Sequence, residues 1–80
     1  MPKVLRVAGF EFYFFSNERT EPMHVHVENA ERLAKFWLSP VSLAWNAGFR
    51  PNEITRIRRI LVDNQQKLQE AWNDFFAGNR

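Results

Sequence analysis

Apolar and polar side chains alternate along four short segments in the first half of the chain. A period of two is typical of a strand that has one face against the core and the other toward solvent. The pattern predicts strands over residues 4–7, 10–15, 23–28 and 33–38. Gly9 permits the positive φ that a two-residue hairpin loop needs, so we expect the first two segments to pair as a hairpin.

The register of the first hairpin follows from a loop at residues 8–9. This loop places Val4 opposite Tyr13 and Arg6 opposite Glu11. Arg6 and Glu11 are a complementary charge pair of the kind that stabilises neighbouring strands. The same register collects one apolar face, formed by Leu5, Val7, Phe10, Phe12 and Phe14.

The second hairpin is predicted to turn around residues 29–32. Its register brings apolar residues together on one face, with Met23 opposite Leu38, Val25 opposite Phe36 and Val27 opposite Ala34. On the reverse face His24 lies opposite Trp37, and His26 lies opposite Lys35. A slip of one residue would mix the two sets, so the pattern itself favours this pairing.

Helix signals follow the fourth strand. Ser39 and Pro40 match an N-cap and a first helical residue, and Gly48 matches a helix end. These signals predict a short helix over residues 41–47.

A second helix is predicted to begin at Pro51 and to end at Gly78. Its apolar residues recur at spacings of three and four, and they are Ile54, Ile57, Leu61, Leu68, Trp72 and Phe75. The stripe has a gap at residues 64–65, where the helix can bend. We therefore predict one α+β domain over residues 1–80, with a four-stranded antiparallel sheet of two hairpins and both helices packed on one face.

Composition narrows the class of protein only slightly. The chain has 80 residues, a net charge of +2, no cysteine and an aromatic share of 15%. Large rings suit a small domain that has no cross-links. No segment approaches the roughly 18 apolar residues needed to span a bilayer, and no long apolar run follows the charges at the N-terminus. We expect a cytoplasmic protein with no membrane contact.

The two histidines are the first candidates for chemistry, because the alternation places His24 and His26 together on the solvent face. As metal ligands they would need a third group, which only Glu18 or Glu21 in the preceding loop, or Glu28, could supply. We favour ordinary surface histidines over this site, and expect no metal and no cofactor.

General acid–base catalysis is the second hypothesis for this face. His24 or His26 could transfer a proton and Lys35 could stabilise a phosphorane charge, as in a metal-independent ribonuclease. Tyr13 or Trp37 could then stack on an RNA base. The alternative, which we favour, is a face that packs on a protein partner or on a second copy as a homodimer, with no catalysis.

Candidate binding residues also lie outside this pair. Glu28 continues the polar face of the third strand. Arg56 and Arg59 belong to a basic cluster on the long helix that could contact phosphate, although a solvated helix face is the simpler interpretation. The rings of Trp45, Trp72 and Phe75, at helical spacing, are interpreted as core.

Several motifs also resemble a known family. They are residues 4–6, the Phe-rich second strand ending at 16–18, Glu21-Pro22 with 24–28, and residues 34–38, 43–49 and 70–72. Together they resemble the bacterial domain-of-unknown-function family numbered 4160 over almost the whole chain. Met23 departs from a frequent second proline, and Arg50 stands where a serine-type helix cap is expected.

The resemblance implies little about activity. Genes of this family often stand beside another small gene, which implies a toxin–antitoxin-like pair, and no established activity carries over. We therefore expect a component of such a pair that binds a partner protein, and RNA as a further ligand, through the histidine and aromatic face. A non-enzymatic interaction or dimerisation module is the alternative.

Overall fold

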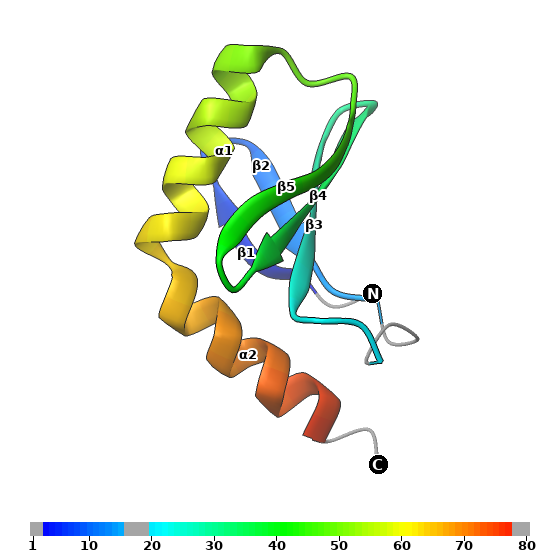
Figure 1. The fold of residues 1–80 in the computed structure, drawn as a ribbon. Helices are drawn as coiled ribbons and strands as arrows, with labels where there is room; N and C mark the ends of the chain where they lie inside the picture. The colour runs from blue at the N-terminus through cyan, green and yellow to red at the C-terminus, as the bar shows by residue number, and fades with distance from the viewer. Residues whose placement is uncertain (1–2, 16–19, 78–80) are drawn as a thin grey trace.

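The computed structural model describes residues 3–15 and 20–77, which form a five-stranded antiparallel sheet followed by two helices (Figure 1). The elements are β1 (Lys3–Val7), β2 (Phe10–Tyr13), β3 (His24–Asn29), β4 (Arg32–Leu38), β5 (Val41–Ala47), α1 (Pro51–Asp63) and α2 (Gln65–Ala77). Each strand pairs with its neighbour in the sequence, so the sheet is a meander. The predicted α+β class is confirmed, whereas the predicted number of strands was wrong.

The fifth strand is the segment that we predicted as a short helix. Ser39 and Pro40 form the turn between β4 and β5, with a cis peptide bond between them, rather than the first turn of a helix. Gly48, with a φ of 104°, lies between β5 and α1. β4 offers a row of backbone donors and acceptors that a fifth strand satisfies and a helix would not. Strand pairing therefore overrides the local helix signals.

The predicted long helix is divided into α1 and α2, which follow one another at an angle along the same side of the sheet (Figure 1). Asn64 separates them, and its side-chain amide donates to the Ile60 carbonyl over 2.8 Å. Gln65 and Gln69 both donate to the Leu38 carbonyl, over 2.9 and 2.8 Å. The gap in the apolar stripe thus coincides with a break between the two helices. The two glutamines after the break attach α2 to the end of β4. Gly78, the predicted helix end, lies outside the described residues.

The helices cover one face of the sheet and bury its apolar side chains. From the sheet these are Phe10, Phe12, Phe14, Val25, Val27, Ala34, Phe36 and Leu38, and from the helices Ile54, Ile57, Leu61, Leu68, Trp72 and Phe76. We call the sheet side of this core the covered face. Phe75, which was predicted as core, is only partly buried and packs against the cluster.

Both hairpin registers were predicted almost completely. In the second hairpin, every predicted pair from His24 with Trp37 to Val27 with Ala34 is present. In the first, Arg6 lies opposite Glu11 and forms an ion pair with it. The error is Val4, because a bulge between Lys3 and Leu5 gives the place opposite Tyr13 to Lys3.

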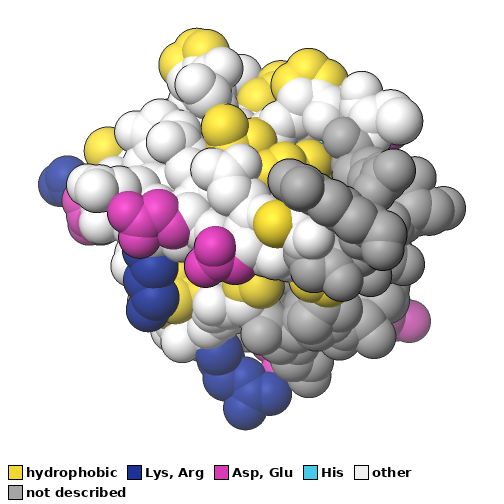
Figure 2. Space-filling view, turned by 90° about the horizontal axis from the view of Figure 1, so that it is seen from below, with side chains coloured by type: hydrophobic (Ala, Val, Ile, Leu, Met, Phe, Trp, Pro, Cys, Tyr) yellow, Lys and Arg dark blue, Asp and Glu magenta, His cyan; other side chains and the backbone are white. Residues whose placement is uncertain are grey.

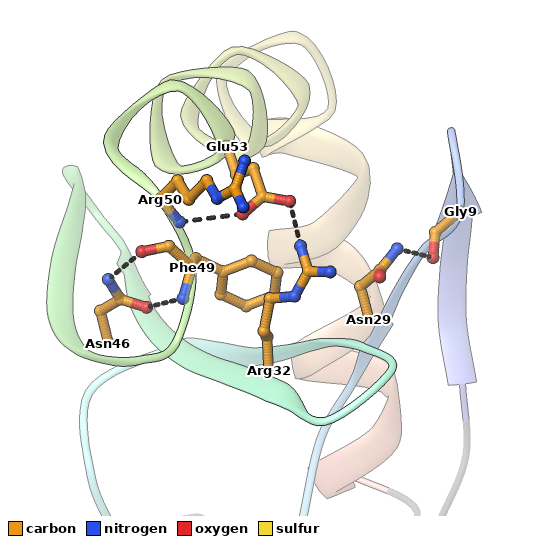
Figure 3. Close-up of polar contacts among 7 residues, drawn as sticks. All are labelled: Gly9, Asn29, Arg32, Asn46, Phe49, Arg50 and Glu53. Atoms are coloured by element: carbon orange, nitrogen blue, oxygen red, sulfur yellow. Dashed lines mark hydrogen bonds and ion pairs between the residues drawn. The ribbon is translucent and has the colours of Figure 1, made fainter.

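A small polar network holds the corner between β5 and α1 (Figure 3). The Asn46 side chain donates to the Phe49 carbonyl and accepts from the Phe49 backbone N–H, both over 3.0 Å. The Glu53 carboxylate accepts from the backbone N–H of Arg50 over 2.8 Å and also pairs with Arg32 of β4. Glu53 therefore makes one half of a capping box, in which the carboxylate accepts from the N–H of the residue before the helix, whereas the Arg50 side chain, which has only donors, cannot make the other half.

Candidate functional site on the aromatic sheet face

The sheet face opposite the covered face is built by strands β2 to β5. Its side chains alternate with those of the core, and its central members are Tyr13, Phe15, His24, His26, Lys35, Trp37 and Trp45. We call this surface the aromatic face. Its position follows from the period-two alternation that also defines the core, so the two faces are specified together.

Trp45 reaches the aromatic face because of a bulge. Phe36 pairs with Leu43, but Lys35 pairs with Trp45, so Ala44 is one extra residue in β5. One extra residue exchanges the faces of the residues that follow it. Trp45 therefore joins Lys35 instead of the core, and 41% of its surface is exposed. Our interpretation of Trp45 as a core residue was wrong, since it assumed a helix.

His24 and His26 lie on this face as predicted, but they are not on a wet surface. His24 is 0% exposed and His26 is 4% exposed. The His26 ring stacks on Tyr13 at 5.7 Å between centroids and meets the edge of Phe15 at 4.4 Å. The expectation of solvent-facing histidines is therefore corrected, because neighbouring rings cover them.

His24 is enclosed at the end of the sheet. Its ring lies 5.0 Å from the Trp72 ring of α2, 5.7 Å from Trp37 and 5.3 Å from His26, as centroid distances. Its Nδ1–H donates to the Pro22 carbonyl over 2.9 Å. A carbonyl only accepts, so this contact places a proton on Nδ1.

Lys35 is held by a carboxylate from the segment before β3. Its Nζ donates to Glu21 Oε1 over 2.6 Å and lies 4.7 Å from the centroid of the Trp37 ring. The same Glu21 oxygen is 3.9 Å from His24 Nδ1. From the sequence Glu21 was considered only as a metal ligand, whereas in the structure it is the anionic partner of Lys35. A phosphate group would have to displace Glu21 to reach this lysine.

Tyr13 and Glu28 form a second contact across neighbouring strands. The Tyr13 hydroxyl donates to Glu28 Oε1 over 3.1 Å. Burial, the hydrogen bond to Glu28 and the negative charges of Glu28 and Glu11 together raise the pKa of Tyr13 to about 12. The hydroxyl therefore remains a donor at neutral pH. Glu11 lies directly opposite Glu28 and pairs with Arg6.

The structure brings together six of the eight predicted site residues. Tyr13, His24, His26, Glu28, Lys35 and Trp37 all lie on the same face of adjacent strands. Arg56 and Arg59 do not join them, since they are exposed on α1, which packs on the opposite side of the sheet. Three roles were not predicted: Glu21 as the partner of Lys35, Trp45 as a residue of the aromatic face, and Trp72 as a cover of His24. For Trp45 the alternation of residues 41–45 indicates a strand, but it does not indicate the bulge that turns the ring to the aromatic face.

The aromatic face offers little for a metal ion. Within residues 3–15 and 20–77, no three His, Cys, Asp or Glu side chains converge in a way that could hold one. His24 Nδ1 already binds a carbonyl. Glu18, one of the ligands considered from the sequence, lies outside the described residues. No pocket is present in the part of the chain that the structure describes, so the site is a surface.

The end of the molecule toward which α2 runs has a different surface (Figure 2). There, hydrophobic side chains form patches between polar atoms, with acidic and basic side chains together along one margin. Scattered apolar groups are ordinary on protein surfaces. Trp45 is more distinctive, since it is the one exposed aromatic ring among the described residues.

The fold and the site together define a small α+β domain with helices on one sheet face and an aromatic, histidine-centred surface on the other. Residues 9–73 match the family described as Domain of unknown function (DUF4160), and the chain belongs to this family. The resemblance found in the sequence is thereby confirmed. No curated protein and no solved structure matches the chain. Among the described residues, no helix is both long and apolar enough to cross a membrane.

Proposed function

We propose that the protein is a binding component that holds a partner protein against its aromatic face, without catalysis by that face. The observation that supports this proposal is the 41% exposure of Trp45 on a face whose histidines are buried. Exposed tryptophan is enriched at the energetic centres of protein interfaces. The buried histidines pack against the rings of this face, and their burial keeps a substrate from reaching them in this conformation.

The surroundings of Trp45 also suit a protein contact. Leu33 and Ala47 lie opposite each other across β4 and β5 on the same face, two residues from Lys35 and Trp45 respectively. Leu33 is partly exposed and Ala47 is exposed. Trp45, Leu33 and Ala47 therefore form a continuous apolar strip, which we call the β4–β5 strip. Such a strip is what a partner can cover.

The partner named by this proposal is the product of the neighbouring small gene, in the toxin–antitoxin-like pair that the family resemblance implies. The expected result is that Trp45→Ala weakens binding of that product about tenfold or more, because the substitution removes the largest exposed ring. Titration calorimetry with the purified proteins measures the affinity.

Val62→Ala is the matched control for this test. Val62 is 54% exposed on α1, on the other side of the sheet, so its truncation should leave the affinity within about twofold. Equal affinities for the wild-type protein and Trp45→Ala would reject the aromatic face as the binding surface.

RNA cleavage is a second candidate, favoured by the approach of His24, His26 and Lys35. The two imidazole centroids are 5.3 Å apart, and Lys35 lies on the adjacent strand. Catalysis would require the segment containing Glu21 to move, because Glu21 holds Lys35 and the histidines are buried.

This candidate predicts that the purified protein cleaves a labelled RNA and that Lys35→Gln abolishes the cleavage. Lys35→Gln is a better probe than removal of the histidines, since loss of buried rings would also disturb packing. Absence of cleavage by the wild-type protein, or equal cleavage by Lys35→Gln, would dismiss this candidate.

A further inference from the structure

The three described carboxylates around the aromatic face are held differently. Glu11 pairs with Arg6, and Glu21 pairs with Lys35. Glu28 is exposed, and its carboxylate accepts from the neutral hydroxyl of Tyr13. Glu11 and Glu21 are therefore each paired with a cation of the same chain. The described contact of Glu28 is with a neutral hydroxyl, which orients the carboxylate but does not neutralise its charge.

Glu28 is also next to the β4–β5 strip. It lies directly opposite Leu33, which in turn lies opposite Ala47. Neighbouring strands are about 4.8 Å apart, so roughly 10 Å separates the backbone of Glu28 from that of Ala47. The Glu28 side chain and a lysine or arginine side chain of the partner can together span such a distance while the residues beside that cation cover the strip.

We propose that the partner segment bound by the aromatic face is cationic, with a lysine or arginine that pairs with Glu28 while adjacent apolar residues cover Trp45 and Leu33. This inference rests on the proposed function, because it names the chemistry of the partner at the same surface. Charge complementarity is the argument for it. Opposite charges at an interface set partner choice, and like charges disfavour the wrong partner.

The surroundings of Glu28 strengthen its preference for a cation. The Tyr13 hydroxyl, whose pKa is raised to about 12, donates to one carboxylate oxygen and holds it in place. Because a carboxylate held in place loses little freedom when a guanidinium or ammonium group pairs with it, the cost of binding falls.

The test uses the neighbouring-gene product as the probe and compares Glu28→Lys with Trp45→Ala. Glu28→Lys should weaken binding about tenfold or more, because it replaces attraction with repulsion. Glu28→Gln should weaken binding less and reduce its dependence on salt. Glu31→Lys is the matched control, since Glu31 is an exposed carboxylate in the β3–β4 turn, and its affinity should stay within about twofold.

The outcomes separate this inference from the proposed function. Loss of binding in Trp45→Ala with unchanged binding in Glu28→Lys would overturn the cationic partner and leave the binding surface in place. Equal losses in Glu28→Lys and Glu31→Lys would also overturn it, since net charge would then explain the effect. If sedimentation shows that the protein self-associates and Glu28→Lys abolishes this, a second copy occupies the face and the inference fails.

Discussion

The two faces of the sheet are stabilised in different ways. On the covered face, Phe12, Val25 and Phe36 are fully buried among the side chains of both helices. On the aromatic face, neighbouring rings enclose the buried histidines, and directional contacts join Lys35 to Glu21 and Tyr13 to Glu28. Apolar burial has no preferred direction. The covered face can therefore only stabilise the fold, whereas the aromatic face keeps groups with defined orientation.

This difference also separates stability from binding. Removal of a side chain from the covered face leaves a cavity that both layers must accommodate. Removal of an exposed ring from β5 leaves no cavity, because solvent already reaches it. Truncation on the covered face should thus chiefly lower stability, whereas truncation of the exposed ring on the aromatic face should chiefly weaken binding.

The largest expected effect is on the covered face. Phe36→Ala should lower the free energy of unfolding by about 3–5 kcal/mol, since Phe36 is 0% exposed and packs in the main core. Trp45→Ala, although it removes a larger ring, should lower it by less than about 1 kcal/mol. Denaturant unfolding followed by circular dichroism measures both values. Similar losses in the two variants would show that the faces do not differ as described.

The smallest expected effect concerns the hydrogen bond between Tyr13 and Glu28 on the aromatic face, and it is visible only at high pH. The chain has one tyrosine, so absorbance of tyrosinate reports Tyr13 alone. Its midpoint should lie near 12 instead of 10.0, mainly because of burial. The folded pKa is raised, so the stability it contributes is complete below pH 10 and is lost as the pH rises from about 10 to 12.

Glu28→Gln sharpens the same measurement. It removes a negative charge beside the hydroxyl but leaves the burial, so the midpoint should fall while staying above 10.0. A wild-type midpoint at the ordinary value would contradict the buried contact between Tyr13 and Glu28.

Much of the fold could be predicted because a wrong register between two alternating strands would place polar residues among core residues. The register of β3 and β4 was predicted completely, since a slip would have placed His26 or Lys35 among core residues. The face shared by Tyr13, His24, Lys35 and Trp37 followed from the same alternation. The gap in the apolar stripe indicated a bend at residues 64–65, and the structure has a helix break at Asn64.

The two errors in residues 39–48, the predicted helix and the core position of Trp45, have a common physical origin. Ser39, Pro40 and Gly48 are compatible with a helix start and end, but they are equally compatible with the turns that bound β5. The unpaired edge of β4 decides between these possibilities, and that edge exists only after the sheet has formed. The bulge at Ala44, which exposes Trp45, arises from the same pairing.

The sequence by itself determined the alternation of side chains, the register of both predicted hairpins except at the bulge beside Val4, and the membership of the histidines in one sheet face. These features depend on chain neighbours and on cross-strand partners that the pattern identifies. Only the tertiary structure decided how deeply that face is buried, because Phe15 and Trp72 come to the histidines from separate elements. It also decided that Glu21 holds Lys35 and that Trp45 faces solvent, since side-chain contacts between distant segments depend on packing.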